Sequence, residues 1–531
     1  MCLLVLSIPS PAQTVFSHGW SIWCEYGQNN LQQTSDGGYI LCTDAVPEMD
    51  TVNNLAWCYL LKLDPMGNQQ WAVQFAKSTY FMKASDGNSV VQTSDGGYAV
   101  ATVMYTSTPS QSSSHTAIFV VKTNSLGGLL WSKTYPGVGN SSSSCISETA
   151  NHDLIIAGNT IDTTAFAQYG YLLRIDSTGN VIWGNYYVQP SSSAYGLFYT
   201  ASETSDSGLI VAGTTGIQGI TMKTDAAGNV LWANQPNTAM GGIDNDVMET
   251  GDGFFVSCGV SFGSPGNACI NKFDSAGNFV WGFSYPRLSS STSASDYAYS
   301  VEESGTGYSI ATASGSSGYG RAGLLHVDTA GQPIWAKQYK DSYIFYPIDL
   351  EHTSDNGYAM CVSNYNIASS NWNDWKVAVL KVDSLGKAAC HDSVIVDSAY
   401  TLATPMPISI TVVSAAPVVP IPTVLHYVLI PDTNYCFAPD AVVETRPEAG
   451  TGIFPNPAHS QFQVELTGLT GNQVTVSLYN SPGQEVCSRY AENASGTWTN
   501  TFETGGLAAG IYFVRMEVDG ELLKSEKVVI E

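Results

Sequence analysis

Positive charge is scarce in this sequence. Its 531 residues include 20 lysines and arginines against 45 aspartates and glutamates, a formal net charge of −25. An acidic surface of this kind repels the phosphates of nucleic acids and of anionic lipids. We therefore expect no nucleic acid and no anionic membrane surface as a partner. Charged residues make up 12% of the chain and apolar residues 44%, which predicts a folded chain rather than a disordered one.

The sequence also lacks the motifs of metal, cofactor and redox sites. Its 11 cysteines form no C-x-x-C pair, and its 8 histidines form no H-E-x-x-H motif, which excludes the usual zinc spacings and a thiol redox motif. We predict no catalytic residue, no metal ligand and no cofactor. Cys390 and Cys436 bracket a Pro-rich segment, and they form a candidate disulfide because an exported protein meets oxidising conditions. The other cysteines lie mostly in strand-like runs and are expected to be buried.

Long hydrophobic runs are missing too. Past the N-terminus no segment has the about 18 uninterrupted apolar residues that a membrane-spanning helix needs, so we expect no transmembrane span. Residues 1–13 (MCLLVLSIPSPAQ) have an apolar core followed by Pro-Ala-Gln but no cationic start. We interpret them as a secretory signal peptide whose beginning lies upstream, and the alternative is a chance apolar N-terminus.

The abundant feature is a phrase in two halves that recurs seven times. The first half reads T-S-D-G-G-Y in its clearest copies, and the second reads D-x-x-G-N-x-x-W. First halves lie at Thr34–Tyr39, Thr93–Tyr98, Thr149–Leu154, Thr204–Leu209, Thr250–Phe254, Ser304–Tyr308 and Thr353–Tyr358. Second halves lie at Asp64–Trp71, Asn124–Trp131, Asp176–Trp183, Asp225–Trp232, Asp274–Trp281 and Asp328–Trp335, and a seventh opens at Asp383 without its Trp. A period of roughly 49 to 60 residues predicts units that pack against one another.

Each repeat has the pattern of a four-stranded antiparallel meander. In the second repeat the predicted strands are Ser89–Thr93, Tyr98–Tyr105, Ile118–Thr123 and Leu129–Tyr135, joined by tight turns rich in Asp and Gly. Four strands at this period predict an all-β, seven-bladed β-propeller over residues 14–388. A solenoid is the alternative. Thr14–His18 (TVFSH) resembles the outer-strand phrase W-S-K-T-Y at Trp131–Tyr135, so we expect it to complete the last blade and close the ring.

Three further positions recur with the phrase. Trp lies at positions 71, 131, 183, 232, 281 and 335. A Trp ladder can bind sugars, but recurrence in successive blades is what packing requires, and we favour packing. A cation precedes the second turn (Lys62, Lys122, Arg174, Lys223, Lys272 and Lys381, with His326 in the sixth repeat), and a polar or acidic residue precedes the first (Gln33, Gln92, Glu148, Glu203, Glu249 and Glu303). We interpret both sets as ion pairs between strands or between blades rather than as a binding or catalytic site.

Two catalytic patterns are matched only superficially. Gly259–Gly263 fits G-x-S-x-G, but that motif needs a following helix to expose its Ser, and here a strand is predicted to follow. The turn phrase is similar to the sialidase Asp-box, S-x-D-x-G-x-x-W, but the sequence offers no Arg cluster to hold a carboxylate. We therefore predict neither a serine-hydrolase activity nor a sialidase activity for this chain.

The meander topology separates constant from variable connections. First-to-second and third-to-fourth connections hardly vary, whereas second-to-third connections and the links between blades do, and these variable segments emerge on one face. Aromatic residues on that face are the candidate binding residues: Trp57, Trp372, Trp375, Tyr343, Phe345 and Tyr346. Such residues suit stacking on sugar rings or anchoring a protein partner. The alternative is that they pack onto their own blades.

The last fifth of the chain has a different character. Residues 389–450 are rich in Pro and predict an extended linker, with strand pairs docked on the propeller as an option. Short strands are then predicted at Gln461–Leu466, Val474–Tyr479, Glu485–Tyr490, Trp498–Thr504, Gly510–Val518 and Leu522–Ile530. This spacing predicts a small Ig-like β-sandwich over residues 451–531.

Four strings in this tail resemble the type A C-terminal sorting domain of type IX secretion in Bacteroidota. They are F-P-N-P, V-S-L-Y-N-S-P-G-Q-E-V, L-A-A-G-I-Y-F-V-R and the final K-V-V-I-E. The motif residues are Pro455, Asn456, Pro457, Gly483, Gly510 and Tyr512. The resemblance implies export through the outer membrane, interaction with the secretion machinery, removal of the tail, and release or anchoring at the cell surface. An ordinary carbohydrate-binding or adhesive sandwich is the alternative.

These observations predict a secreted or surface-anchored, non-enzymatic binding protein whose variable face meets a glycan or a protein. A glycan-active hydrolase or lyase is the first alternative, and it predicts two carboxylates or a metal set at the channel mouth of that face. A purely structural surface component is the second.

Overall fold

The structure is a computed structural model, and it is all-β. It describes residues 15–20, 30–45, 55–76, 82–83, 89–105, 116–135, 139–162, 165, 167–189, 195–216, 218–235, 242–262, 266–285, 295–316, 319–339, 343–366, 375–388, 392–395, 400–401, 406–407, 411–414, 419–420, 424–427, 432–434, 451–480, 485–518 and 521–530. Every element among these residues is a strand, and none of them forms a helix that could cross a bilayer. The chain divides into two compact units, Met1–Phe437 and Ala438–Glu531.

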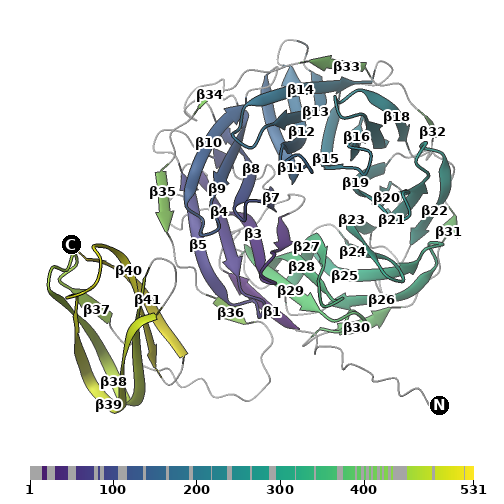
Figure 1. Cartoon of the computed structure of the whole chain (residues 1–531). Coiled ribbons are helices and arrows are strands. Elements are labelled where there is room, and N and C mark those ends of the chain that lie inside the picture. The colour runs from purple at the N-terminus through teal and green to yellow at the C-terminus, as the bar shows by residue number, and fades with distance from the viewer. Residues whose placement is uncertain are drawn as a thin grey trace, which may run out of the picture. The chain divides into compact units, whose positions relative to one another are not determined.

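In the first unit, each of the first six repeats folds into a four-stranded antiparallel sheet, as the spacing of the turns predicts. These strands are β2 (Leu31–Gln33), β3 (Tyr39–Ala45), β4 (Leu55–Leu63), β5 (Gln69–Ala76), β7 (Ser89–Gln92), β8 (Tyr98–Tyr105), β9 (Thr116–Thr123), β10 (Leu129–Tyr135), β11 (Asn140–Glu148), β12 (Leu154–Asp162), β13 (Ala167–Ile175), β14 (Val181–Val188), β15 (Gly196–Glu203), β16 (Leu209–Thr215), β17 (Gln218–Thr224), β18 (Val230–Gln235), β19 (Gly242–Glu249), β20 (Phe255–Ser261), β21 (Asn267–Phe273), β22 (Phe279–Tyr285), β23 (Ser295–Ser304), β24 (Gly307–Ser316), β25 (Tyr319–Asp328) and β26 (Pro333–Tyr339). A short strand, β6 (Met82–Lys83), pairs with both β4 and β8 and so joins the first two sheets. Figure 1 shows the sheets arranged in a ring, with the first strand of each repeat on the inside and the fourth on the outside.

The seventh repeat supplies three strands, β27 (Tyr343–His352), β28 (Tyr358–Asn366) and β29 (Trp375–Val382). Its fourth place is taken by β1 (Phe16–Trp20), which pairs antiparallel with β29 so that Phe16 lies opposite Lys381. This confirms that the N-terminal segment completes the last sheet. The strand begins at Phe16, and Thr14 lies outside the described residues.

The Pro-rich segment forms a belt around the outside of the ring. Within residues 389–450 the structure has β30 (Asp392–Ile395), β31 (Tyr400–Thr401), β32 (Met406–Pro407), β33 (Thr411–Ser414), β34 (Val419–Pro420), β35 (Val424–Tyr427) and β36 (Asp432–Asn434). They pair antiparallel, in this order, with β26, β22, β18, β14, β10, β5 and β1. The chain thus runs back past every sheet and adds a fifth, outermost strand to each (Figure 1).

The hydrophobic core of the first unit lies between neighbouring sheets. One cluster packs Phe16, Leu31 and Tyr39 from the start of the chain against Ala359 and Val379 from the last repeat. The same kind of cluster fills the space between the first and second repeats. Because the junction that closes the ring has the same kind of apolar core as the next junction, burial stabilises both in the same way.

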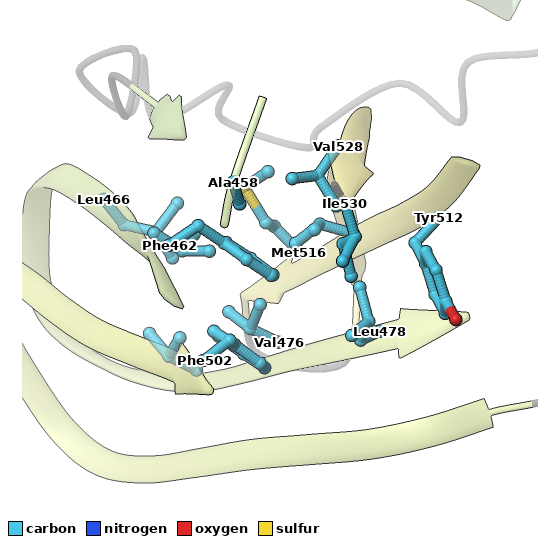
Figure 2. Packing of buried hydrophobic residues seen from close by; sticks show 13 residues of the cluster. Ala458, Phe462, Leu466, Val476, Leu478, Phe502, Tyr512, Met516, Val528 and Ile530 are labelled. Carbon is cyan, nitrogen blue, oxygen red and sulfur yellow. The ribbon is translucent and has the colours of Figure 1, made fainter. Parts of the chain in front are cut away.

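The second unit is a compact β structure with its own core. It consists of β37 (Thr451–Phe454), β38 (Gln461–Asn480), β39 (Glu485–Glu503), β40 (Gly510–Val518) and β41 (Glu521–Ile530), in the order β37–β38–β40–β41, with β39 also paired to β38. Figure 2 shows Phe462, Phe502, Val476 and Met516 meeting in this core. Phe462 and Phe502 stack with their ring centroids 5.1 Å apart.

The prediction of separate short strands in this unit was wrong for two pairs of strands. Gln461–Leu466 and Val474–Tyr479 are parts of the single strand β38, and Glu485–Tyr490 and Trp498–Thr504 are parts of β39. The polar, Gly-containing stretches between them resemble turns in the sequence. The β38–β39 ladder instead passes through them with shifts of register, because β-bulges absorb extra residues without ending a strand.

Candidate functional sites

The two ends of the repeat sheets differ in their connections. First-to-second connections run from Gln33 to Tyr39, Gln92 to Tyr98, Glu148 to Leu154, Glu203 to Leu209, Glu249 to Phe255, Ser304 to Gly307 and His352 to Tyr358. Second-to-third connections cover residues 46–54, 106–115, 163–166, 216–217, 262–266, 317–318 and 367–374. The first-to-second connections are nearly uniform in length, whereas the second-to-third connections differ in length from repeat to repeat. Successive strands are antiparallel, so the two sets lie at opposite ends of the sheets, here named the tight-turn end and the variable end.

At the tight-turn end the repeated charges hold the turns. Asp95 accepts hydrogen bonds from the Gly97 amide and the Thr93 hydroxyl, and the Lys122 Nζ donates to both of its carboxylate oxygens at 2.9 and 2.8 Å. Burial opposes ionisation of Asp95, but the bonds from Lys122, Thr93 and Gly97 outweigh it and lower its pKa to about 2. Equivalent pairs are Lys62–Asp36, Arg174–Asp153, Lys223–Asp206, Lys272–Asp252 and Lys381–Asp355. The interpretation of the cations as ion-pair partners is confirmed for the five lysines and Arg174, whereas His326 of the sixth repeat instead shares hydrogen bonds with the hydroxyls of Thr306 and Ser309.

The polar residue before each first turn links neighbouring repeats. Glu148 of the third repeat accepts a hydrogen bond from the Ser94 amide of the second at 2.7 Å. The same bond joins Gln92 to Ser35, Glu203 to Ala150, Glu249 to Ser205, Glu303 to Gly251 and, across the ring closure, Gln33 to Ser354. These side chains therefore serve the contact between repeats, but through hydrogen bonds from backbone amides; the predicted ion pairs were wrong for this set.

The repeated tryptophans also pack between repeats. The Trp131 Nε1 donates to the Ser177 carbonyl in the second turn of the next repeat at 3.1 Å. A Cβ added at Gly179 in that turn would lie 3.0 Å from the Trp131 ring, so the glycine lets the indole seat directly on the backbone. Trp183 and Trp232 donate to the next repeat in the same way. The packing interpretation is confirmed for these residues.

A pocket of about 360 Å³ lies between the second and third repeats at the tight-turn end. The Ser94 Oγ lies 3.0 Å from the Glu148 carboxylate and 2.7 Å from the His152 Nδ1. A carboxylate only accepts, so the Ser94 hydroxyl donates to Glu148 and the imidazole Nδ1–H donates to Ser94. The Ser proton is committed to Glu148, so His152 is not placed to activate Ser94 as a nucleophile.

Sequence reasoning missed this pocket. His152 occupies the turn position that Gly37 and Gly96 fill in other repeats, and like them it has a positive φ, of 65°. In the third repeat the turn reads T-A-N-H-D, so its Asp is displaced to position 153 and is met by an arginine rather than a lysine. These linked differences between the third repeat and the others were the sequence signal that could have revealed the pocket.

A second group missed by sequence reasoning is a set of buried carboxyls on the inner strands β19, β23 and β27. Asp246 accepts a hydrogen bond from the Val301 amide of the sixth repeat, and Asp349 accepts one from the Leu31 amide of the first. Burial raises the pKa of Asp349 to about 7. Asp246 and Asp349 therefore hold neighbouring repeats together around the inside of the ring.

Glu302 and Glu351 lie further along the same strands, close to the tight turns. Burial and then the charge of Glu351 raise the pKa of Glu302 well above its usual range, and burial and the charge of Asp349 raise the pKa of Glu351 to about 8. The enzyme alternative expects carboxylates at the variable end. Glu302 and Glu351 lie toward the other end, whereas the buried Asp244 and Asp296 lie near the starts of β19 and β23, at the variable end. Within the part of the chain that the structure describes, no group of three or more His, Cys, Asp or Glu could hold a metal ion.

The predicted binding residues belong to the first and last repeats. Trp57 lies near the start of β4, Trp375 opens β29, and Tyr343, Phe345 and Tyr346 lie at the start of β27. All of these backbone positions are at the variable end. Their side chains, and all of Trp372, lie outside the described residues. Cys390 and Cys436 also lie outside them.

Ser261, the centre of the G-x-S-x-G match, is the last residue of β20, and strand β21 follows it. Its hydroxyl donates to the Asn267 carbonyl at 3.2 Å. Since no helix follows, the nucleophile-elbow geometry is absent at this position, as expected.

In the second unit, the motif residue Asn456 holds the final strand. Its Nδ2 donates to the Lys527 carbonyl at 2.7 Å, and its Oδ1 accepts from the Val529 amide at 2.9 Å. Pro455 and Pro457 flank it and are exposed. The Tyr512 hydroxyl donates to the Ala508 carbonyl at 3.0 Å, close to Gly510, the first residue of β40. Gly483 lies outside the described residues.

Comparison with known proteins bears on this second unit. Residues 452–531 match the secretion system C-terminal sorting domain. The chain thus carries a sorting domain of the type IX secretion system of Bacteroidota, which implies interaction with the secretion machinery and a secreted or cell-surface location. A comparison with curated proteins found no match.

Solved structures resemble the chain at low identity. A protein of unknown function from Bacteroides caccae is 11% identical, covers 51% of this chain and 94% of its own, and has a TM-score of 0.30. The NanB sialidase from Streptococcus pneumoniae is 10% identical over 70% of each chain, with a TM-score of 0.40.

Proposed function

We propose that this sorting-domain protein is a secreted or surface-anchored seven-bladed β-propeller with an Ig-like tail, and that it binds a glycan or a protein through the variable end of its blades. The tail directs export, and the propeller supplies recognition. The domains are residues 14–388 for the propeller, with the belt around it, and 451–531 for the sorting sandwich.

One observation carries this proposal: the contrast between the two ends of the blades. At the tight-turn end the repeated Asp, Lys, Glu and Gln side chains are engaged in turns and in contacts between repeats. At the variable end the connections differ in length and composition from blade to blade. A scaffold that fixes one end and varies the other has the usual arrangement of a recognition surface built from loops.

The aromatic residues at the variable end favour glycans and proteins over other partners. Trp57 belongs to the first repeat and Trp372 and Trp375 to the last, and these two repeats are joined through β1 and the Gln33–Ser354 bond. An indole face stacks on the C–H face of a sugar or anchors a partner's side chain. A net charge of −25 opposes polyanionic partners.

The proposal is tested by probing the full chain on a glycan array and on an array of bacterial and host extracellular proteins. We expect binding that is lost in the variant Trp57→Ala/Trp372→Ala/Trp375→Ala. The matched control is Met66→Ala/Leu126→Ala/Leu385→Ala, which removes three exposed apolar side chains (59%, 65% and 65% exposed) from the tight-turn end. Equal loss in both variants, or unchanged binding in the first, would contradict the assignment of the face.

A further inference from the structure

We propose that Cys42 and Cys58 form a disulfide when the exported chain folds under oxidising conditions. Cys42 lies on β3 and Cys58 on β4, and their Sγ atoms are 3.4 Å apart. Both are thiols in this structure, and both side chains are fully buried. The pair is distinct from Cys390 and Cys436, the two cysteines that the sequence suggests as partners.

The strand register brings the two sulfurs together. Thr43 lies opposite Tyr59, so Cys42 and Cys58 flank this pair diagonally. Directly opposite residues share a face of the sheet, as do residues two apart on one strand, so both cysteines point to the same side. A disulfide bond is about 2.05 Å long, so the sulfurs must approach by about 1.4 Å. Diagonal neighbours have Cα atoms roughly 7–8 Å apart and disulfide partners usually less than about 7 Å, so the bond also requires β3 and β4 to move closer together at this point.

The chemistry is thiol–disulfide exchange with a disulfide oxidant, such as oxidised glutathione or a dithiol oxidase of the cell envelope. The thiolate of one cysteine attacks the oxidant's disulfide and expels one thiolate, forming a mixed disulfide. The second cysteine attacks this mixed disulfide and expels the other thiolate. The two protons lost by the cysteines end on the two thiols of the reduced oxidant. Exported proteins meet such oxidants, whereas cytosolic ones do not.

Burial sets the order of events. The two cysteines belong to the apolar cluster between the first and second repeats, which also contains Val90 and Tyr98 of the second repeat. Buried thiols are inert to exchange, so the bond must form after β3 pairs with β4 and before the second repeat packs on them. The disulfide would then link the two strands that flank the variable connection 46–54, and it would fix the residue that follows Trp57. An effect of the disulfide on ligand binding near Trp57 rests on the proposed function; the formation of the disulfide does not.

The test is a thiol map of the full chain. The protein is refolded from denaturant with reduced and oxidised glutathione, and separately collected after export, then alkylated with iodoacetamide in denaturant and digested without reduction. In most molecules we expect the Cys42 and Cys58 peptides to be joined and lighter by two hydrogens than their reduced sum. Reduction should separate them. Iodoacetamide on both residues in refolded and exported protein would overturn the proposal, whatever the outcome of the binding assays.

Cys258 and Cys269 provide the matched control. They also lie on adjacent strands, β20 and β21, and are also buried. Cys269 lies opposite Gly259, so Cys258 and Cys269 point to opposite faces of the sheet. They should remain unlinked under the same conditions. In the Cys42→Ser variant, Cys58 should carry the alkyl label, and linkage of Cys58 to another cysteine in that variant would show indiscriminate oxidation and count against the proposal.

Discussion

Phe16 occupies the place in the last sheet that tryptophan occupies in the others. It lies opposite Lys381, as Trp131 lies opposite Lys122. A Cβ added at Gly67 would lie 2.5 Å from the Phe16 ring. The ring therefore packs directly against the backbone of the second turn of the first repeat, as the Trp131 ring packs against Gly179. One aromatic residue near the N-terminus thus supplies the contact that the truncated seventh phrase lacks.

This contact predicts a large effect of Phe16→Ala. Loss of a buried Phe ring leaves a cavity at the ring closure and should lower the free energy of unfolding of the first unit by about 3 kcal/mol. Chemical denaturation followed by Trp fluorescence measures it. Phe16→Trp, which restores the residue of the other repeats, should cost much less. An unchanged midpoint for Phe16→Ala would show that β1 contributes little to closure.

The carboxyl groups predict a stability that depends on pH in two opposite ways. The pKa of Asp95 and that of Asp206 are lowered to about 2, so their contribution is complete above about pH 4 and is lost as the pH falls toward 2. The pKa values of Asp349 and Glu351 are raised to about 7 and about 8. Their contribution is complete below about pH 4 and is lost as the pH rises through 7 to 8.

The melting temperature of the first unit should therefore be highest near pH 4 to 5 and fall toward pH 8. Glu351→Gln keeps the shape of the side chain but cannot ionise, so it should flatten the fall between pH 5 and 8. Glu465→Gln, in the second unit, is the control and should leave this slope unchanged. Differential scanning calorimetry from pH 3 to 9 measures both slopes. A wild-type stability that rises from pH 5 to 8 would contradict the assignment.

For individual residues, the sequence predicted the contacts that recur in the repeats and missed the side chains whose roles occur in one repeat only. The Lys–Asp pairs and the Trp contacts recur at fixed places in the phrase, so their structural role could be inferred. His152, Glu302 and Glu351 each depart from the repeat. Their roles depend on burial and on neighbours brought close by the ring, which no spacing along the chain reveals.

Among the elements, the belt formed by β30 to β36 was the least predictable. The repeat strands follow from alternating residues and turn chemistry. The belt strands are two to four residues long and interrupted by Pro, so a local pattern indicates only an extended segment. Their partners are outer strands that lie from about 55 to more than 400 residues earlier. The belt covers part of each outer edge, and covering an edge is a known protection against edge-to-edge association.

The belt predicts a local effect of proline at Val412 and Val413. Val413 lies opposite Tyr186 of β14, and one of two successive amides in a strand faces its neighbour. Val412→Pro/Val413→Pro removes both amides, so those β14 amides at 185–188 that face β33 should exchange with solvent at least about tenfold faster, and those that face β13 should not. The amides of β13 should stay protected. Val412→Thr/Val413→Thr is the control, and equal exchange in both variants would show that β33 does not pair there.

For the whole molecule, the proposed function depends on which strand ends lie together. The order of strands in each repeat and the closure by β1 put every tight turn at one end and every variable connection at the other. That residues 452–531 form a sorting domain, and the export that this implies, could be predicted from the sequence. The ligand of the proposed binding face could not, because the connections at the variable end differ from repeat to repeat and share no pattern.

Closure by β1 is the claim on which this account depends, and amide hydrogen exchange of the native full chain tests it most directly. We predict that the amides of Phe16–Trp20, which β29 flanks on one side and β36 flanks on the other from His18 onward, exchange as slowly as those of Val377–Lys381 and become labile in the same unfolding event. Exchange of Phe16–Trp20 within seconds, while β29 stays protected, would contradict the closed ring and the separation of its two ends.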